Sequence, residues 1–481
     1  MRWKESILLA LILLGAFTVR LYRFNNPVAD WHSWRQADTS SVSRNFVKYG
    51  FDLLHPRMNN ISNVQSGKEN PMGYFYAEFP LYNAAQAGLF ITFHHFTIEE
   101  WGRLVTIGMS CLSIVFLYFL GKRYIGRLGG LLAAFFFAFV PFSIYYSRVI
   151  LPDPSMVAAT LGAILFLDIS LSSKTRKRGL SLLAISLLLS ILALLFKPYA
   201  IFFLVPTMLY QVFKKYSWKL LLRLDLWVYA ILAVIPLGLW RLYMQHYPEG
   251  IPANAWLFNE GNIRFTGAYF YWLFAERISK LILGYWGIAI VFLGMLWTKK
   301  KNVGFFVSFL VGSLLYMVVI ARGNVQHDYY QILIVPTLAL FFGLGGDFLL
   351  QLFESKTNKW LGGLLFIVCT LFMLSFGWYN VRDYFNINNP NMIIAGQAVD
   401  ALTPKNAKVI APLDGDSSFL YQTNRQGWAS FDFDLPVLIK LGADYMILVN
   451  PTQNDYNGFG KQYKVVSSSS AYLLLDLHQK Q

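Results

Sequence analysis

Long runs of apolar residues, separated by short polar segments, dominate the chain from residue 6 to residue 378. A helix of about 20 apolar residues crosses the roughly 30 Å hydrocarbon core of a bilayer. The pattern therefore predicts a polytopic membrane protein with about eleven crossings. We place the crossings at 6–24, 103–121, 127–147, 156–172, 180–196, 200–213, 226–243, 279–298, 303–320, 330–350 and 361–378.

One further apolar run, from Phe79 to Phe96, does not fit this alternation. If it crossed the membrane, every later basic loop would change sides. The run also contains Asn83, Gln86 and two adjacent histidines. We therefore expect a helix that lies in the outer interface or dips into it.

The short polar segments between the runs are basic, and this sets the orientation. Basic loops face the cytoplasm by the positive-inside rule. The N-terminus is then cytoplasmic, the longer loops and the part after residue 378 are extracytoplasmic, and we expect the plasma (inner) membrane. The basic clusters are Arg2/Lys4, Lys122/Arg123/Arg127, Lys174/Arg176/Lys177/Arg178, Lys214/Lys215/Lys219/Arg223, Lys299/Lys300/Lys301 and Lys356/Lys359.

Composition agrees with this prediction. Of the 481 residues, 56% are hydrophobic and 14% are charged, whereas soluble domains have about 25% charged residues. The formal net charge of +15 comes from the cytoplasmic loops, so we read it as topology and expect no nucleic-acid partner. The two cysteines lie inside apolar runs and form no metal-ligand pattern.

The C-terminal part, residues 379–481, is more polar and predicts a small extracytoplasmic α/β domain. Strand-like runs occur at 408–412, 445–449 and 471–475, and helices are expected at 393–402 and 435–441, before Gly442. The predicted fold class is mostly α. It combines a transmembrane bundle over 1–378, whose first external loop is 25–102, with this α/β domain.

The first external loop carries carboxylates next to Trp and Arg. Asp30 and Asp38 flank a segment with two tryptophans and Arg35, and a helix is expected to start after Asp38. A carboxylate at the water–lipid boundary beside an arginine suits a general base. The alternative is an interfacial Trp anchor with a helix cap. Glu78, before Pro80, is a second carboxylate or a first-turn partner of the helix dipole.

Two further charges belong to the ends of apolar runs. Asp153 lies between two prolines on the external side, and Lys197 lies at the outer end of an otherwise uncharged span. An ionisable residue at membrane depth is a functional candidate and needs a partner. Asp153, or an aspartate of the first loop, is the expected partner. A helix cap for Asp153 and snorkelling for Lys197 are the alternatives.

Arg and His side chains in the external loops suit phosphate binding. The expected donor-phosphate ligands are Arg35, His246, Arg264, Arg322 and His327. An aromatic belt with polar trim is the alternative for His327. No spacing such as His-Glu-x-x-His occurs, so we assign no metal ligands and expect no required cofactor. A divalent metal is possible, although nothing in the sequence supports one.

These segments together resemble the membrane glycosyltransferases of the C-type fold, in the protein O-mannosyltransferase and aminoarabinose-transferase-like superfamily. The resemblance covers about residues 6–378. Its matching segments, in chain order, are Trp34-Arg-Gln-Ala-Asp38-Thr, Ser43-Arg-Asn45, Glu78-Phe-Pro-Leu81, Gly121-Lys-Arg-Tyr-Ile-Gly126, Tyr145-Tyr-Ser-Arg148, Leu151-Pro-Asp153, Lys197-Pro198 and His327-Asp-Tyr-Tyr330.

The resemblance implies a polyprenyl-phosphate sugar donor and inversion at the anomeric carbon. It implies that Asp38 is the acceptor base, with Asp30 in reserve, and that Asp153 and Lys197 pair near the active site. Two positions depart from the family pattern: Ala37 precedes Asp38 where many relatives have an Asp-Glu pair, and Phe79 replaces one proline of Pro-Pro-Leu.

The resulting hypothesis is an inverting glycosyltransferase that moves a sugar to a lipid, glycan or protein acceptor at the external leaflet. Its partners are the lipid-linked donor, the acceptor and membrane lipids. It requires Asp38, Glu78, Asp153 and Lys197 to meet around one lipid head-group pocket. The alternatives are a transporter or lipid flippase, and a scaffold or receptor in which the C-terminal domain is the working part.

Overall fold

The computed structural model describes residues 3–297, 302–351 and 360–480. The chain forms two compact units, each described by itself. The helical unit comprises Met1–Tyr22, Thr106–Trp240 and Asn254–Asp383, and the mixed unit comprises Arg23–Val105, Arg241–Ala253 and Tyr384–Gln481. The predicted basic residues Arg2, Lys299, Lys300, Lys301, Lys356 and Lys359 lie outside the described residues.

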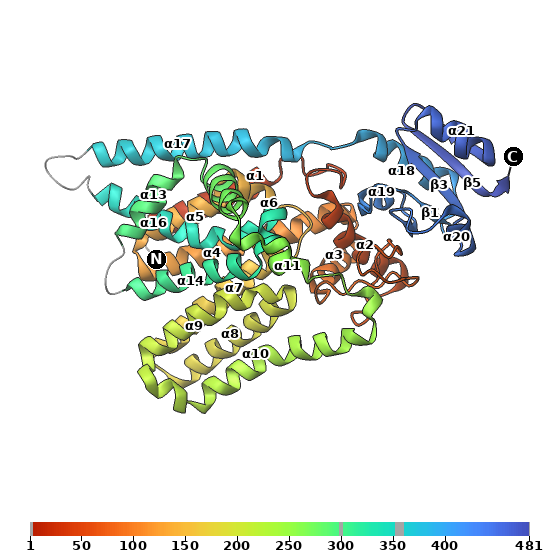
Figure 1. Ribbon diagram of the computed structural model, residues 1–481. Coiled ribbons are helices and arrows are strands. Elements are labelled where there is room, and N and C mark those ends of the chain that lie inside the picture. Colours follow the sequence, from red (N-terminus) through yellow and green to blue (C-terminus); the bar gives the residue numbers. More distant parts are fainter. Residues whose placement is uncertain (1–2, 298–301, 352–359, 481) are drawn as a thin grey trace. The chain divides into compact units, whose positions relative to one another are not determined.

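The helical unit consists of apolar helices and short connecting turns (Figure 1). Some of its helices begin or end in segments assigned to the mixed unit. The main helices are α1 (Trp3–Arg20), α4 (Ile98–Tyr124), α5 (Arg127–Phe139), α6 (Pro141–Tyr146), α7 (Asp153–Leu171), α8 (Arg176–Phe196), α9 (Ile201–Tyr216), α10 (Leu224–Tyr243), α13 (Gly287–Leu296), α14 (Val303–Val319), α15 (Ala321–Gln326), α16 (Val335–Gln351) and α17 (Leu361–Val381). Shorter elements are α11 (Trp256–Asn259), α12 (Gly267–Phe270) and a π-helix at Tyr271–Ile282.

Five helical stretches in the described residues are long and apolar enough to cross a membrane, or up to six if a bent pair counts as one span. The bent pair is Gly267–Ile282 with Gly287–Leu296, which meet at 111°. The multi-pass prediction is confirmed, while the number of crossings stays a prediction. The five stretches are Ile98–Tyr124, Asp153–Leu171, Arg176–Phe196, Leu224–His246 and Leu361–Leu402.

Glycines allow the backbones of several helices in this unit to approach closely. A Cβ on Gly345 of α16 would lie 1.8 Å from the carbonyl oxygen of Ile290 in α13, and one on Gly294 would lie 2.0 Å from that of Phe341. Gly343 meets α5 in the same way. Small residues at helix interfaces are typical of membrane bundles, where van der Waals packing replaces the hydrophobic effect.

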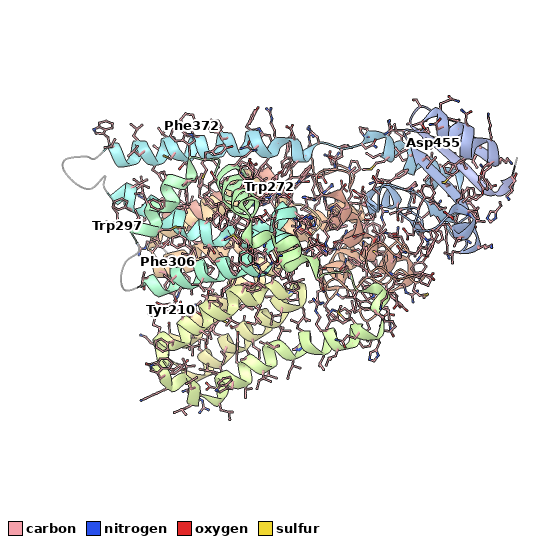
Figure 2. The ribbon with its side chains drawn as sticks, in the orientation of Figure 1. Tyr210, Trp272, Trp297, Phe306, Phe372 and Asp455 are labelled. Atoms are coloured by element: carbon pink, nitrogen blue, oxygen red, sulfur yellow. The ribbon has the colours of Figure 1, made fainter. Side chains whose placement is uncertain are left out.

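Other helical faces keep their large apolar side chains exposed. On α10, Leu224 is 75% exposed and Leu242 is 63% exposed. On α17, Phe372, which Figure 2 labels, is exposed. Its ring stacks on that of Trp286, with 4.8 Å between the ring centroids. Apolar faces of this extent suit contact with lipid.

The mixed unit contains a five-stranded sheet in the order β2-β1-β3-β5-β4. The pairs β1–β2 and β1–β3 are parallel, and the pairs β3–β5 and β4–β5 are antiparallel. The strands are β1 (Lys408–Ile410), β2 (Gln426–Trp428), β3 (Tyr445–Val449), β4 (Tyr463–Ser468) and β5 (Tyr472–Lys480). The helices of the same segment are α18 (Pro390–Leu402), α19 (Ser417–Gln422), α20 (Leu435–Lys440) and α21 (Gln453–Gln462).

The prediction of a C-terminal α/β segment is confirmed. Gly442 follows α20 with φ +98°, the conformation of a helix stop. The helix α21 begins with a reciprocal cap between Thr452 and Asp455, which Figure 2 labels. The sequence did not predict β2, β4, α19 or α21.

The first external loop packs within the mixed unit together with the C-terminal segment. Its backbone adds to the sheet edge, since Ile61 N–H donates to Gly427 and Gly427 N–H donates to Asn59. Ala29 belongs to the same buried cluster as Val409 and Leu474. The predicted domain boundary at 378/379 stays a prediction, and the structure adds that residues 23–105 pack with residues 384–480.

Two helices of this loop position the predicted site residues. The helix α2 (Ser33–Tyr49) starts six residues before the expected Thr39, so the prediction that Asp38 starts the helix is wrong. The residue before the helix, His32, has φ +54° and provides no side-chain cap. The helix α3 (Leu81–Thr92) has 12 residues. At 1.5 Å per residue it is too short to cross a bilayer, as expected for 79–96.

Candidate functional site

Asp38 lies inside α2 and is almost completely buried, with 2% of its surface exposed. Each carboxylate oxygen accepts one hydrogen bond from a distant segment of the mixed unit. The Ser417 hydroxyl donates to Oδ1 at 2.6 Å, and the Gln65 amide donates to Oδ2 at 2.8 Å. The carboxylate is therefore fixed in position by polar neighbours but held away from bulk water.

Burial raises the pKa of Asp38 to about 6. Desolvation is the largest cause, because it disfavours the charged carboxylate. The hydrogen bonds from Ser417 and Gln65 and the charge of Arg35 oppose the shift without cancelling it. A carboxylate with a pKa near the working pH can both accept and release a proton, which general-base catalysis requires.

Arg35 and Glu78 form a partly buried ion pair in the mixed unit. The guanidinium NH2 lies 2.6 Å from Oε2 and 2.7 Å from Oε1 of Glu78. The guanidinium also lies over the ring of Phe75, at 5.4 Å from its centroid. Arg35 was predicted to bind the donor phosphate, and the structure places it against a carboxylate that holds its orientation.

Asp30, the reserve base, is fully buried before α2. Its Oδ1 accepts a hydrogen bond from Gln36 at 2.6 Å, and its backbone carbonyl accepts one from Asn388 at 2.9 Å. Asp30 therefore ties the start of α2 to the C-terminal segment.

His246, a predicted phosphate ligand, is exposed in the mixed unit, with its ring 6.4 Å from that of Tyr243. Another histidine of this unit, His55, has three polar contacts. The Nε2 of His55 lies 2.9 Å from the Tyr243 hydroxyl and 3.1 Å from that of Tyr247, and Nδ1 lies 2.9 Å from Asp52. His55 was not among the residues predicted from the sequence, because two of its three partners, Tyr243 and Tyr247, are far away in the chain.

In the helical unit, the predicted pairing of Asp153 with Lys197 is present. The Lys197 ammonium donates to Oδ1 of Asp153 at 2.8 Å and to Oδ2 at 3.0 Å. Lys197 caps the end of α8 in an extended conformation, and Asp153 is the first residue of α7. The rings of Tyr330, Tyr329 and Tyr199 surround the ammonium at 4.9, 5.5 and 5.6 Å. Aromatic faces at such distances stabilise a cation.

The segment around His327 is buried and rich in aromatic contacts. The His327 ring stacks on Tyr329 at 5.5 Å and meets Trp256 edge-on at 5.5 Å. The neighbouring Asp328 accepts a hydrogen bond from Tyr146 at 2.5 Å and lies 3.8 Å from Arg277. Asp328 is thus held from two sides, and His327 is placed by the same turn.

Arg264 and Arg322 lie on two elements that pack against each other, the turn at Glu260–Phe265 and α15. Arg264 NH2 donates to the carbonyls of Phe258 at 3.0 Å and Val319 at 3.3 Å. The Nε–H groups of both arginines are buried and have no hydrogen-bond partner among the described residues. Such donors are available to an anionic ligand.

Arg277 is a third arginine of this region, and it is not among the residues predicted from the sequence. It lies on the π-helix Tyr271–Ile282, and its NH2 donates to the carbonyl of Val325 at 3.1 Å. Its Nε–H is also buried without a partner within the part of the chain that the structure describes. The sequence carries no clear signal for it, because Arg277 lies just outside the predicted crossing 279–298 and has Glu276 and Lys280 as charged neighbours.

The predicted residues therefore fall into two groups. Asp30, Arg35, Asp38, Glu78 and His246 belong to the mixed unit. Asp153, Lys197, Arg264, Arg322 and His327 belong to the helical unit. A single pocket that contains members of both groups stays a prediction, as do the individual roles of these residues. In the described parts of both units, no three His, Cys, Asp or Glu side chains group as metal ligands would.

Comparisons with known proteins identify the fold. Residues 80–240 match the family described as dolichyl-phosphate-mannose-protein mannosyltransferase. No curated protein sequence matches the chain. The structure is similar to that of ArnT from Cupriavidus metallidurans bound to undecaprenyl phosphate, with a TM-score of 0.66, 12% identity, and coverage of 99% of this chain and 98% of that chain.

The structure is also similar to the oligosaccharyltransferase of Archaeoglobus fulgidus in complex with Zn and sulfate. The TM-score is 0.60 at 10% identity, over 92% of this chain and 67% of that chain. The same enzyme tethered to an acceptor peptide gives 0.58 at 12% identity, over 97% and 72% of the two chains. The predicted resemblance is confirmed: this multi-pass chain has the C-type fold of the membrane glycosyltransferases, and its residues 80–240 carry the sequence pattern of the mannosyltransferase family.

Proposed function

We propose that the chain is an inverting glycosyltransferase that takes a sugar from a polyprenyl-phosphate donor. The acceptor is a hydroxyl of a lipid, glycan or protein at the external leaflet of the plasma membrane. The fold and the family segment support this assignment, and the similar ArnT structure is bound to undecaprenyl phosphate. The observation that carries the proposal is the state of Asp38, a buried carboxylate with a pKa raised to about 6.

Asp38 has the properties that the acceptor base needs. Its two hydrogen-bond donors, Ser417 and Gln65, hold the carboxylate in one orientation. The remaining lone pairs can accept the proton of an acceptor hydroxyl. Because ionisation is already disfavoured by burial, the carboxylate gains from taking that proton, and a base of this kind contributes about 10²- to 10⁴-fold to a rate.

The proposed step is a single displacement. The acceptor oxygen forms a bond to the anomeric carbon as the bond from that carbon to the phosphate oxygen breaks. The hydroxyl proton passes to Asp38, and the bonding electron pair leaves with the polyprenyl phosphate. Displacement from the face opposite the leaving group inverts the anomeric configuration.

The phosphate that leaves develops negative charge, and we assign its stabilisation to arginines of the helical unit. Arg264, Arg322 and Arg277 each keep a buried Nε–H without a partner among the described residues. Guanidinium groups bind phosphate through directed hydrogen bonds and are most effective when fixed in advance. Lys197, which is held by Asp153 and three tyrosines, stabilises the same negative charge on the leaving phosphate.

The other predicted ligands receive more limited roles. Arg35 is oriented by Glu78 and lies one helical turn before Asp38, so we assign it to positioning the base and the donor. His327 and the exposed His246 stay proposed contacts to the donor phosphate. Since the arginines supply the positive charge, we propose that transfer needs no resident metal ion.

Mass spectrometry of lipid-linked and protein-linked glycans tests the function in cells. In a strain that lacks the protein, we expect one glycan to lose a sugar and its polyprenyl-phosphate donor to accumulate. A transporter would instead leave transfer in detergent-solubilised membranes intact. Detergent extracts with and without EDTA separate the two cases and test the metal: we expect transfer with the protein only, and equally in EDTA.

A further inference from the structure

We propose that the mixed unit holds a second ligand site, which binds an anionic sugar. The site is a cavity of about 470 Å³ formed by the second half of α2, the segment around Arg57 and the loop after α19. Sites for small molecules usually measure about 300–1,000 Å³. A phosphorylated monosaccharide or disaccharide therefore has the size that this cavity accepts.

The cavity is lined by positive charge without any carboxylate. Arg44 and Lys48 stand four residues apart on α2 and so share one helical face. Arg57 and Arg425 add two further cations from other segments. A concave surface of this charge attracts anions, and guanidinium groups favour phosphate or carboxylate.

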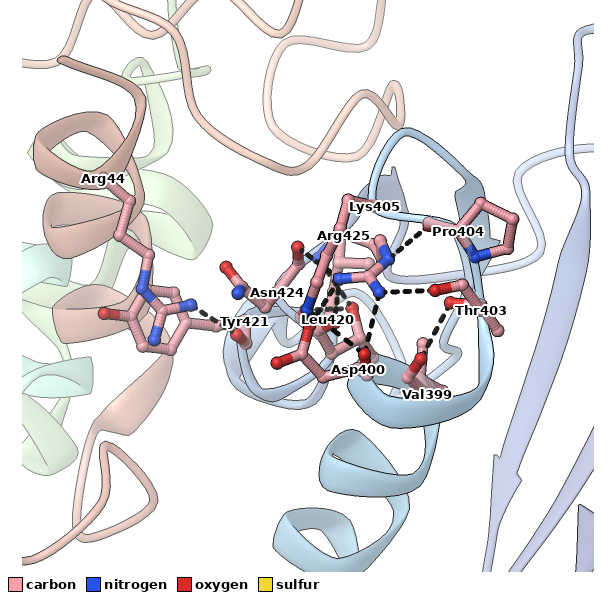
Figure 3. Close-up of polar contacts among 11 residues, drawn as sticks. Arg44, Val399, Asp400, Thr403, Pro404, Lys405, Leu420, Tyr421, Asn424 and Arg425 are labelled. Carbon is pink, nitrogen blue, oxygen red and sulfur yellow. Dashed lines mark hydrogen bonds and ion pairs between the residues drawn. The ribbon is translucent and has the colours of Figure 1, made fainter. Parts of the chain in front are cut away.

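Two of these four cations already have anionic partners within the protein. Arg44 NH2 lies 2.6 Å from Glu99, and Arg425 NH1 lies 2.6 Å from Asp400. Figure 3 shows both arginines: Arg44 lies against the ring of Tyr421, at 3.5 Å from its centroid, and Arg425 is surrounded by hydrogen bonds. The side chains of Arg44 and Arg425 are therefore held in place by contacts within the protein.

The other two cations are uncompensated. Lys48 and Arg57 form no ion pair within the described residues, and each lies near one aromatic ring. Lys48 is 5.0 Å from the ring centroid of Tyr49, and Arg57 is 5.5 Å from that of Tyr74. The cavity therefore has a net charge that an anionic ligand neutralises, whereas a neutral ligand leaves it exposed.

The amide side chains that line the cavity indicate that the rest of the ligand is a sugar. Asn59, Asn424 and Gln426 line the cavity, and their side-chain amides make no hydrogen bond in the part of the chain that the structure describes. Each amide offers donors and an acceptor, which match hydroxyl groups. Tyr49 and Phe90 supply apolar surface beside them. Inorganic phosphate would use the cations and leave these amides and rings unused.

This site is separate from the surroundings of Asp38. Arg44 follows Asp38 by six residues on α2, which turns it by about 240° around the helix axis. Neither partner of Asp38, Ser417 or Gln65, lines the cavity. That the natural ligand is the acceptor glycan rests on the proposed function, whereas the binding of an anionic sugar does not.

Isothermal titration calorimetry of the full-length chain in detergent tests the site with three probes: glucose 1-phosphate, inorganic phosphate and glucose. We expect saturable binding of glucose 1-phosphate, at least tenfold weaker binding of inorganic phosphate, and none of glucose. The double variant Lys48→Gln/Arg57→Gln should lose at least tenfold in affinity. The control Lys440→Gln/Lys461→Gln removes the same charge from two exposed positions outside the cavity and should bind normally.

A second variant guards against a folding defect. Asn424 has φ +53°, a conformation that aspartate also tolerates, so Asn424→Asp places a carboxylate in the cavity with little strain. It should also weaken glucose 1-phosphate at least tenfold. Absence of binding, or unchanged affinity in either variant, overturns the site. Equal affinity for inorganic phosphate overturns the assignment of a sugar. None of these titrations measures transfer, so their failure leaves the proposed function standing.

Discussion

The Lys197 ammonium lies 2.8 Å from one carboxylate oxygen of Asp153 and 3.0 Å from the other, and both side chains are buried in the helical unit. Removing two charges from water costs several kcal/mol per ion, and the attraction between them repays this only when the geometry is good. The tyrosine rings around Lys197 add to the stabilisation of the cation. The intact pair therefore adds little to the stability of the fold, whereas loss of one partner is strongly destabilising.

This asymmetry gives the first prediction. Asp153→Asn leaves Lys197 as an uncompensated buried cation and should lower the free energy of unfolding by about 3–5 kcal/mol. The double variant Asp153→Asn/Lys197→Met removes both charges and should regain much of that loss, without regaining transfer. Thermal unfolding in detergent and a transfer assay measure the two effects. A double variant that is less stable than Asp153→Asn would contradict the account of the pair.

The raised pKa of Asp38 predicts how stability depends on pH. A buried acid whose pKa rises from 3.8 to about 6 binds its proton more tightly in the folded state, so folding is opposed when the group is ionised. The shift of about two units corresponds to about 3 kcal/mol. Asp38 thus lowers stability above pH 6, and this cost disappears as the pH falls through 6 towards 4.

Asp38→Asn isolates this contribution, since the amide does not ionise. Relative to Asp38→Asn, the wild-type protein should be less stable at pH 7.5 than at pH 4.5, by about 2 kcal/mol. Parallel thermal unfolding of the two proteins across this range measures the difference. A difference that does not change with pH would show that Asp38 has an ordinary pKa.

The pKa of Asp38 also determines the acid limb of the pH–rate profile, the range in which the transfer rate falls as the pH is lowered. Only the ionised carboxylate can accept the hydroxyl proton, so the rate should fall about tenfold per pH unit below about 6. Ser417 donates to Asp38 and lowers its pKa, so Ser417→Ala should move the limb to higher pH. Ser418→Ala is the matched control, because the Ser418 hydroxyl contacts Met392 instead. Equal limbs for the Ser417 and Ser418 variants would argue against Asp38 as the base.

Asp400 contacts two cations that should differ greatly in importance. Its Oδ1 lies 2.6 Å from Arg425, which is buried, and 2.7 Å from Lys405, which is 71% exposed (Figure 3). Arg425 also donates to the carbonyls of Pro404 and Thr403. Arg425→Lys loses several of these hydrogen bonds and leaves buried acceptors without a donor. We therefore expect the free energy of unfolding to fall by about 2–4 kcal/mol.

Lys405→Gln breaks only the exposed pair and should cost less than about 1 kcal/mol. Thermal unfolding of the two single variants under one set of conditions compares them directly. Similar losses for both would mean that the hydrogen bonds of Arg425 to the backbone contribute little.

Local features of the sequence were enough to predict part of this structure. The run 445–449 is continuously apolar, as a buried strand is, and β3 has those bounds. Lys197 inside an apolar run required a partner, and Asp153, at the outer end of a neighbouring run, supplies it. Both predictions rest on short-range patterns and on the cost of burying charge.

The predictions failed where contacts between distant segments decide the outcome. The helix α2 begins without a side-chain cap, so the cap rule pointed to Asp38 rather than Ser33. Ser417, which holds Asp38, lies 379 residues away in the chain. The strand β2 has only three residues, including Gly427, and forms because β1 and the first loop offer hydrogen bonds on both sides. No local pattern encodes such pairings.

The most direct test of the account is transfer by the purified chain in detergent, with a radiolabelled polyprenyl-phosphate sugar as donor and a membrane extract as the source of acceptors. The account predicts a labelled acceptor with the wild-type protein and none with Asp38→Asn, although that variant folds. No labelled product from the wild-type protein with any polyprenyl-phosphate sugar, or full labelling with Asp38→Asn, would contradict it.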